Sequence, residues 1–360
     1  MRVLMITSEW PTPDNPRLVP FIVRQVEFLR KANVSVDVFS FRGAKNPVNY
    51  ARAWYRVHRM LRDGSYDLVH AQWGQSALPA IPTGLPLVVT FRGGEGDGIV
   101  GDNGEYTLTG QALRAVGWFV SRRADQLVLV SSHMRRFVPN RLVHVIPAGL
   151  DFSKLVLMPK AEARRQLNLP PSKRLVLFAG DPAEARKRYP LASEVVSRLD
   201  PALGAQLVLA WNVDYEQIPL YMNACDAMLF VSMWEGSPNV VKEALACNLP
   251  VVSIDVGDVA ERLAGIEGSV LCQDADPDRL AAALDGVLRA NRRVDSRSSV
   301  MELDESRLAE RMIQIYKIAL SRPGGDHETV SYRAADVSQN VHTEIDAPAR
   351  PGRLPTATAP

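Results

Sequence analysis

The chain has 360 residues, of which 46% are hydrophobic and 23% carry a charge. A chain of this length has room for about two domains, and this composition can bury a core, which excludes disorder for most of its length. Its longest apolar runs, Pro86–Phe91 and Ala227–Met233, are far shorter than the roughly 20 residues of a membrane-spanning helix. Three cysteines without a CxxC pair argue against a disulfide framework or a zinc site and fit a reducing compartment.

The net charge of +2 is distributed unevenly along the chain. Residues 1–165 carry a formal charge of +9, and residues 166–360 carry −7. A basic first half and an acidic second half indicate two domains with different partners. The basic half would attract an anionic ligand, lipid or polymer.

Short apolar strands alternate with helical segments, and the pattern occurs twice. In the first half the predicted strands are Arg2–Thr7, Val34–Phe41, Leu68–Ala71, Leu87–Phe91, Leu127–Val130 and Leu142–Ile146, and the predicted helices are Phe21–Lys31, Ala51–Arg62 and Gln111–Ala124. After a connecting segment, Phe152–Pro171, the strands are Arg174–Ala179, Gln206–Ala210, Ala227–Val231 and Val251–Ile254. The helices of this half are Pro190–Leu199, Ile218–Ala224, Pro238–Cys247, Asp278–Ala290 and Asp304–Leu320. Such alternation predicts βαβ units and parallel sheets.

Two halves of this kind predict an α/β protein with two facing, Rossmann-like, doubly wound domains. We expect an N-terminal domain at residues 1–165 and a C-terminal domain at 166–320, whose last helix can pack back on the first domain. Ligands of doubly wound sheets bind at the carboxyl ends of the strands, so the fold predicts one cleft between the domains. Residues 321–360 hold prolines and small polar residues and are expected to be a disordered tail.

Several common catalytic motifs do not occur in the sequence. There is no GxGxxG after the first strand, no GxxxxGK[ST] and no GxSxG, which argues against dinucleotide-binding, P-loop and serine-hydrolase sites. The six histidines are scattered and form no HExxH pair, so no histidine metal site is expected.

The segment Trp234–Glu243, with the sequence WEGSPNVVKE, is the strongest candidate site. It follows directly on a predicted buried strand. Ser237 is a natural N-cap and Pro238 a natural first residue of a helix, because proline lacks the amide hydrogen that would be unpaired there. The amides of Asn239 and Val240 would then face the cleft and, with the helix dipole, bind an anion such as a diphosphate.

Two glutamates lie on either side of this helix start. Glu235 is in the loop, and Glu243 is expected at the margin of the buried helix stripe, beside Val240, Ala244 and Cys247. Ionised carboxylates only accept hydrogen bonds, and the vicinal hydroxyls of a sugar or a ribose are the matching donors. A diphosphate flanked by two hydroxyl-bearing groups describes a nucleotide-sugar.

The spacing of Glu235 and Glu243 matches the E-x7-E motif of retaining glycosyltransferases of the GT-B fold, and the chain is most similar to family 4 of these enzymes, the glycosyl transferases group 1 type. Pro147–Asp151 also resembles the interdomain turn of the family. The resemblance covers about residues 1–320 and is strongest from 140 to 262. It implies a donor site in the C-terminal domain and an acceptor site in the N-terminal domain.

The resemblance also implies roles for individual residues. The first glutamate, Glu235, would contact the donor sugar and the second, Glu243, the ribose. Lys187 would contact the donor diphosphate and offset the charge that develops as it leaves, with Arg186 or Arg188 as a further cation. The rest of the expected donor site is Gly180, Gly236, Ser237, Pro238, Asn239 and Val240. On the acceptor side we expect Glu9, Arg17, Arg92 and Gly93, in the segments Glu9–Arg17 and Arg92–Asp97.

The chain departs from the family pattern at three places. Asp181 stands where the family often has arginine, Val19–Phe21 where it usually has glycine, and Arg92 where histidine is common. Arg92 can hydrogen-bond a sugar hydroxyl or a phosphate but cannot act as a base at neutral pH. These departures are compatible with altered specificity or with a degenerate enzyme.

The resemblance therefore implies a retaining, metal-independent hexosyltransferase that moves a sugar from a nucleotide-sugar to a hydroxyl of a glycan, a lipid-linked acceptor or a small molecule, in polysaccharide or glycoconjugate synthesis. No cofactor is expected, because the nucleotide-sugar is a substrate. Two alternatives stay open. A nucleotide-sugar epimerase can share this fold, and a catalytically degenerate relative would only bind sugars.

Basic and aromatic residues interleave in the first half of the chain. The residues concerned are Arg52, Trp54, Tyr55, Arg56, Arg59, Arg62, Trp118, Phe119, Arg122, Arg123, Arg135, Arg136 and Arg141. Helices of this composition can lie on anionic membranes. We expect a cytoplasmic protein, with the inner face of the membrane as a further location, and no nucleic-acid partner. The alternative, in which the aromatic rings pack inward and the arginines are only solvated, stays open.

Overall fold

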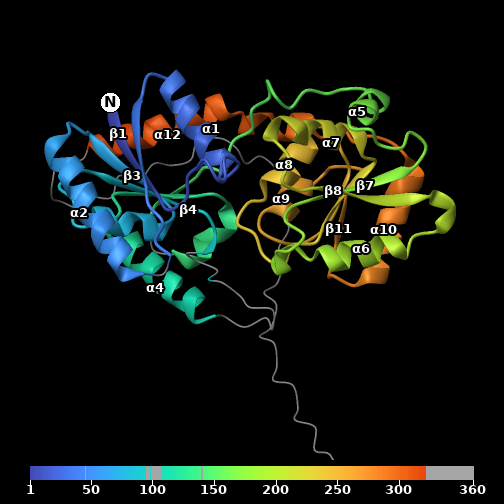
Figure 1. Ribbon diagram of the computed structural model, residues 1–360, viewed down its shortest axis with the longest axis horizontal. Helices are drawn as coiled ribbons and strands as arrows, with labels where there is room; N and C mark the ends of the chain where they lie inside the picture. Colours follow the sequence, from blue (N-terminus) through green and yellow to red (C-terminus); the bar gives the residue numbers. More distant parts are fainter. Residues whose placement is uncertain (45, 95–97, 99–106, 139–140, 322–360) are drawn as a thin grey trace, which may run out of the picture. The chain divides into compact units, whose positions relative to one another are not determined.

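The computed structural model describes residues 1–44, 46–94, 98, 107–138 and 141–321, which fold into two parallel β-sheets with helices on their faces (Figure 1). The predicted α/β class is therefore confirmed. Except for Ser321, the predicted disordered tail lies outside the described residues. Each sheet is built from the strands of one half of the sequence and has its own hydrophobic core.

The first sheet has six parallel strands in the order β2-β1-β3-β4-β5-β6. In chain order they are β1 Arg2–Thr7, β2 Ser35–Ser40, β3 Leu68–Gln72, β4 Leu87–Phe91, β5 Gln126–Leu129 and β6 Val143–Val145. Strands β3, β4 and β5 are buried along their whole length, as expected for a parallel sheet that is covered on both faces. One face carries α1 (Pro20–Lys31), and the other carries α2 (Pro47–Asp63), the 3-10 helix η1 (Gly74–Ala80) and α4 (Leu108–Arg123).

The second sheet has five parallel strands in the order β11-β10-β9-β7-β8. They are β7 Arg174–Ala179, β8 Ala205–Ala210, β9 Ala227–Phe230, β10 Val251–Ile254 and β11 Val270–Cys272. The helices of this half are α5 Lys160–Gln166, α6 Tyr189–Ser197, α7 Ile218–Ala224, α8 Asn239–Ala246, α9 Val259–Leu263, α10 Pro277–Ala290 and α11 Arg297–Val300, and the short 3-10 turns are η3 Ala185–Lys187, η4 Pro201–Leu203, η5 Tyr215–Gln217 and η6 Met301–Leu303. A further 3-10 turn, η2 (Ser132–Phe137), follows β5 of the first sheet.

The last described helix, α12 (Glu305–Leu320), returns to the first sheet and lies beside α1 (Figure 1). Its apolar stripe, which includes Leu308, Met312 and Ile315, joins the core beneath α1. The Tyr316 hydroxyl lies 2.7 Å from Nδ1 of the fully buried His70 in β3. Helix α12 thus packs against a sheet whose strand β3 lies more than 200 positions earlier in the sequence.

Every strand and helix expected from the sequence is present, with ends that shift by a few residues. Helix α2 starts earlier than expected, because the side chain of Asn46 caps it by accepting a hydrogen bond from the amide of Val48. The elements not expected were all short: the 3-10 segments η1, η2, η3, η4, η5 and η6, the helices α5, α9 and α11, and the strand β11. The edge strand β11 has three residues and the helix α11 has four. Segments this short do not repeat a hydrophobic pattern often enough to be recognised in the sequence.

The carboxyl ends of the strands position the site. Trp73 follows β3, Arg92 follows β4 and Val130 follows β5. In the second sheet, β7 ends at Ala179, and the loop that starts α8 follows β9. Parallel strands bring all these ends to one edge of each sheet.

Candidate active site

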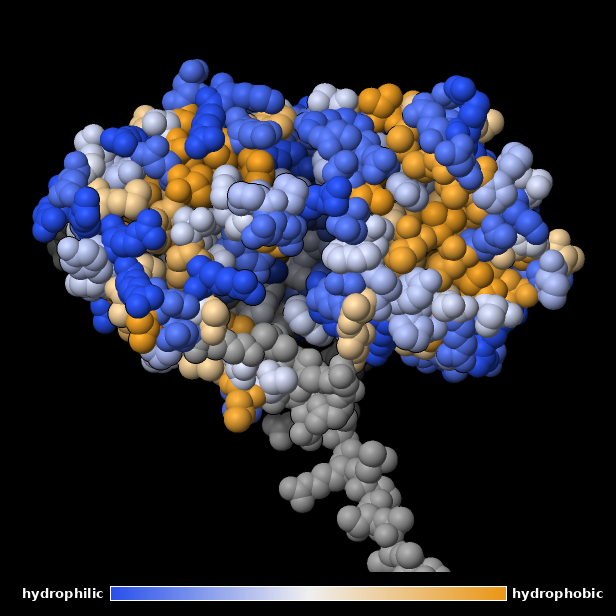
Figure 2. Space-filling view, viewed as in Figure 1, coloured by the Kyte–Doolittle hydropathy of each residue, from blue (hydrophilic) through white to orange (hydrophobic). Residues whose placement is uncertain are grey.

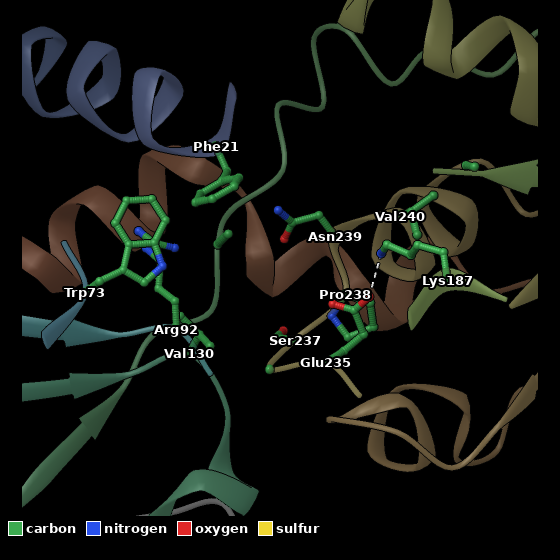
Figure 3. Close-up of a pocket in the computed structure, with 13 residues that line it drawn as sticks. Phe21, Trp73, Arg92, Val130, Lys187, Glu235, Ser237, Pro238, Asn239 and Val240 are labelled. Carbon is green, nitrogen blue, oxygen red and sulfur yellow. Dashed lines mark hydrogen bonds and ion pairs between the residues drawn. The ribbon is translucent and has the colours of Figure 1, made fainter. Parts of the chain in front are cut away.

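A cavity of about 310 Å³ lies at these strand ends (Figure 3). From the first sheet and its helices it is lined by Phe21, Trp73, Arg92, Val130 and Ala148, and from the second by Ala179, Lys187, Glu235, Gly236, Ser237, Pro238, Asn239 and Val240. Residues from both sheets therefore share one cavity, as the predicted cleft requires.

Glu235 is the centre of a partly buried ionic cluster, of which Glu235 and Lys187 line this cavity and Arg186 does not. Its Oε1 atom accepts hydrogen bonds from Lys187 Nζ at 2.5 Å and from Arg186 Nη1 at 2.7 Å. The side chains of Glu235 and Lys187 are each only 14% exposed. Arg186 also pairs with Glu184 and lies over the ring of Trp234, 4.9 Å from its centroid. Two cations from the turn η3 thus bind one carboxylate from the loop after β9, and Figure 3 shows Lys187 and Glu235 of this cluster.

The Lys187 side chain lies against Gly180. The φ of Gly180, +153°, favours glycine, and a Cβ atom there would lie 3.5 Å from Lys187 Cδ. The aliphatic part of Lys187 therefore passes directly over the Gly180 backbone. Arg188, the other cation considered from the sequence, caps α6 in a left-handed conformation, and it does not line the cavity.

Helix α8 begins one residue later than expected. Pro238 is its N-cap and Asn239 its first residue, so the prediction of Ser237 as N-cap and Pro238 as first helical residue was wrong. The physical reason is that the Ser237 hydroxyl donates to Asp258 Oδ2 at 2.8 Å and accepts from Lys242 Nζ at 3.1 Å. The first turn of α8 still lines the cavity, and its amides have no partner within the helix.

Residues of the first sheet contact the loop between β9 and α8 directly. The Ser131 hydroxyl donates to the Gly236 carbonyl at 2.9 Å. A Cβ atom on Gly236 would lie 2.3 Å from the carbonyl oxygen of Arg92, and one on Gly93 would lie 3.6 Å from the Gly236 amide nitrogen. Only a glycine allows the two backbones to approach this closely.

Two family models match the chain. One, described as glycosyl transferases group 1, matches residues 162–290, and the other, a glycosyl transferase 4-like domain, matches residues 2–149. Together they match more than half of the chain. The chain belongs to the group 1 glycosyltransferases of the GT-B type.

Curated relatives and solved structures agree with this family. The glycosyltransferase is 25% identical to the teichuronic acid biosynthesis glycosyltransferase TuaC of Bacillus subtilis (strain 168), over 79% of this chain and 88% of that protein. It is 24% identical to the D-inositol 3-phosphate glycosyltransferase of Thermobispora bispora, over 76% of this chain and 75% of that protein.

Its fold is similar to that of a sucrose-phosphate synthase from Thermosynechococcus elongatus, with a TM-score of 0.73, 18% identity and coverage of 88% of this chain and 98% of that one. It is also similar to HepE of Anabaena in complex with UDP-glucose, with a TM-score of 0.64, 16% identity and coverage of 88% and 100%.

Glu243 lies deeper in this glycosyltransferase than the sequence suggested. The prediction placed it at the margin of the buried face of α8, but it is 6% exposed and does not line the cavity. Arg24 of α1 and Tyr215 of η5 lie beside it. Burial raises the pKa of Glu243, while Arg24, the Tyr215 hydroxyl and Lys242 oppose that rise. Contacts from elements distant in the sequence, which a helical wheel does not include, account for the difference.

The residues expected on the acceptor side lie in two places. Arg92 lines the cavity, donates to Gln72 Oε1 at 2.6 and 3.0 Å, and lies over the ring of Phe21. Gly93 packs against Gly236. Arg17 instead pairs with Asp214 at 2.8 Å, and neither it nor Glu9 lines the cavity. Burial raises the pKa of the Glu9 carboxyl. Residues 95–97 of the expected acceptor segment lie outside the described residues.

Sequence reasoning missed several residues of the site. Phe21, Trp73, Val130 and Ala148 line the cavity, but none of them was among the expected site residues. Closeness to the carboxyl end of a predicted strand was the signal that could have indicated Trp73 and Val130. For Ala148 the signal was its place in Pro147–Asp151, the segment that resembles the interdomain turn of the family.

The described residues contain no group of three or more His, Cys, Asp or Glu arranged to hold a metal ion. Asp274 and Asp276 have the spacing of an Asp-x-Asp pair, but Asp276 caps α10 and Asp274 pairs with Arg279 at 2.7 Å. None of the described helices combines the length and the apolarity needed to cross a bilayer.

Proposed function

We propose that this glycosyltransferase transfers a sugar from a nucleotide-sugar to a hydroxyl acceptor with retention of the anomeric configuration and without a metal ion. The observation that carries the proposal is the cluster of Lys187, Arg186 and Glu235 beside the start of α8, in which Lys187 and Glu235 line the shared cavity. Cations and helix amides at one wall suit a diphosphate, and a carboxylate next to them suits the hydroxyls of the attached sugar. The N-terminal and C-terminal halves, divided near residue 165, would bind acceptor and donor respectively.

In this proposal the donor diphosphate binds to Lys187, Arg186 and the amides of Asn239 and Val240. Gly180, Gly236, Ser237 and Pro238 shape the backbone around it. Glu235 accepts hydrogen bonds from the sugar. Glu243 is the partner for the ribose, which requires that the side chain of Tyr215 moves away from it when the donor binds.

The reaction would proceed on one face of the sugar. The oxygen of the acceptor hydroxyl forms a bond to the anomeric carbon as the bond from that carbon to the diphosphate oxygen breaks. The acceptor proton passes to the leaving diphosphate, and the electron pair of the broken bond stays on that oxygen. Lys187 and Arg186 stabilise the negative charge that develops on this oxygen. Electrostatic stabilisation of developing charge is usually the largest single contribution to catalysis.

The wall from the first sheet would bind the acceptor. Phe21 and Trp73 offer apolar ring surface, and Arg92 offers donors for a hydroxyl or a phosphate. A glycan or lipid-linked acceptor fits this wall. TuaC is named for teichuronic acid synthesis, which supports a role in polysaccharide or glycoconjugate synthesis. The HepE complex contains UDP-glucose, which supports a nucleotide-sugar as the donor.

Incubation with UDP-, GDP- and ADP-sugars tests the proposal. We expect release of the nucleoside diphosphate and a product whose anomeric configuration, read by NMR, equals that of the donor. An inverted product would refute retention. Conversion of the donor into another sugar would indicate an epimerase, and binding without any turnover would indicate a degenerate sugar-binding relative.

We also propose that the first half binds an anionic membrane from the cytoplasmic side. Helices α2 and α4 pack against the same 3-10 helix η1, and both expose aromatic rings. Tyr55 is 65% exposed and Trp118 60% exposed, with Arg122 lying 3.7 Å from the centroid of the Trp118 ring. Figure 2 shows hydrophilic residues around scattered hydrophobic ones on the visible face of this half. Exposed rings amid arginines are typical of surfaces that bind anionic lipid.

Sedimentation with phosphatidylglycerol vesicles tests this surface. We expect binding that weakens with added salt and that Tyr55→Ala with Trp118→Ala reduces. The matched control is Trp211→Ala, which removes a ring that is 49% exposed in the second half. Equal binding to phosphatidylcholine vesicles, or no binding at low salt, would rule the membrane out as a partner.

A further inference from the structure

Lys242 is a fully buried lysine inside the segment that carries the two glutamates. Its exposed fraction is 0%, and it lies on α8 directly before Glu243. Lysine is almost never fully buried unless it is paired, because taking its charge out of water is costly. An aliphatic side chain could occupy this buried position of α8 without the cost of burying a charge, so the presence of an ammonium group requires an explanation.

The ammonium group of Lys242 joins the two walls of the cavity. Nζ donates to the Ser237 hydroxyl at 3.1 Å and to the Ala148 carbonyl at 3.1 Å. Ser237 belongs to the loop before α8, and Ala148 to the segment after β6 of the first sheet. Both residues line the cavity, whereas Lys242 does not.

The second partner of Ser237 extends this network. The Ser237 hydroxyl donates to Asp258 Oδ2, and Arg262 Nε donates to the same oxygen at 3.1 Å. Asp258 is 3% exposed, so its charge is balanced inside the protein by Lys242 and Arg262. The loop before α8 is therefore linked to the Ala148 segment and to the start of α9 through the buried side chains of Lys242 and Asp258.

We propose that Lys242 is a positioning residue for sugar transfer, which holds Ser237 and the first turn of α8 in register with the Ala148 segment of the opposite wall. The inference rests on the proposed function, because this turn is where the donor diphosphate would bind. A shift of about 1 Å in a bound substrate can lower the rate of a reaction about 100-fold. Lys242 acts only through Ser237 and Ala148, and it does not touch the substrate.

The position of Lys242 also predicts a pH dependence. Burial lowers the pKa of Lys242 to about 8, against the opposing effect of Asp258. The charged groups that face it are Asp258, Arg262, Glu243, Arg24 and Glu305. Above pH 8 the amine loses its charge and with it the attraction to Asp258, so kcat should fall with an apparent pKa near 8.

Lys242→Met is the first test, because it removes the ammonium group and keeps an unbranched side chain of similar length. We expect kcat to fall at least tenfold, with the donor KM changed less than threefold and no decline in kcat near pH 8. Lys242→Arg, which stays charged, should recover part of kcat and also lack that decline. The matched control is Lys160→Met, because Lys160 pairs with Asp226 within the second half and does not line the cavity.

Ser237→Ala gives a second test that does not remove a buried charge. If Lys242 acts through Ser237, the double variant should be no slower than Lys242→Met alone. Additive losses, or a Lys242→Met enzyme with unchanged kcat and pH profile, would overturn the inference. Absence of transfer by the wild-type enzyme with every nucleotide-sugar would instead overturn the proposed function, so the two failures are distinguishable.

Discussion

The close approach of Gly236 to the first sheet makes Gly236→Ala the most informative single substitution. The added methyl group would lie 2.3 Å from the Arg92 carbonyl oxygen. A carbon and an oxygen in contact are about 3.3 Å apart, so the two backbones must separate by roughly 1 Å. That movement would also lengthen the 2.9 Å hydrogen bond from Ser131 to the Gly236 carbonyl. Both contacts lie next to the predicted donor site.

A displacement of this size should lower kcat/KM by about 100-fold, which corresponds to about 2.7 kcal/mol of transition-state stabilisation. We expect most of the loss to be in kcat. The added methyl group would keep the two sheets apart, but it would remove no contact to the nucleotide-sugar. The assay is steady-state release of nucleoside diphosphate from the preferred nucleotide-sugar.

Gly94→Ala is the matched control, because a Cβ atom there would have no heavy atom of the described residues within 4 Å. It should retain wild-type kcat/KM. A Gly236→Ala enzyme within threefold of wild type would show that the contact between Gly236 and Arg92 is not needed for transfer. An equal loss in Gly94→Ala would show that any added methyl group in this region has the same effect.

Three further predictions concern single side chains. Lys187→Met should lower kcat by at least 100-fold, because it removes a cation from the leaving diphosphate, and wild-type turnover by this variant would exclude that role. Glu243→Gln should raise the donor KM more than it lowers kcat, and an unchanged KM in initial-rate assays would argue against ribose binding. Burial lowers the pKa of His70 to about 3, so between pH 6.5 and 3 only the unfolded chain binds this proton and stability falls with acid. At pH 5 the free energy of unfolding should be about 2 kcal/mol lower than at neutral pH. Urea unfolding should show that His70→Gln has lost this decrease. A variant of the surface residue His58, whose ring bonds backbone carbonyls, should still show it.

Much of the fold could be predicted because its signals are local. The strands Leu87–Phe91, Arg174–Ala179 and Val251–Ile254 form with the predicted ends, since a continuous apolar run between polar loops is enough to indicate a buried strand. Glu235 was also found from its place after such a strand. The exact start of α8 could not be predicted, because the Ser237 hydroxyl bonds to Asp258, a residue 21 positions later.

The depth of Glu243 and the contacts of Lys242 depend on elements that are distant in the sequence. Arg24 and Tyr215 lie beside Glu243, and they come from α1 and η5. The Ala148 carbonyl that accepts from Lys242 lies 94 positions earlier in the chain. No periodicity within α8 can report such neighbours.

The hydrophobic pattern of adjacent residues was enough to predict the α/β class, the repeat of two sheets and the location of a polar loop after a buried strand. Only the packed structure shows that Lys187 and Arg186 share one oxygen of Glu235, that Gly236 contacts Arg92, and that Glu243 is enclosed. The physical reason is that burial, charge pairing and steric contact depend on distances in space, and those are set only when both sheets are packed.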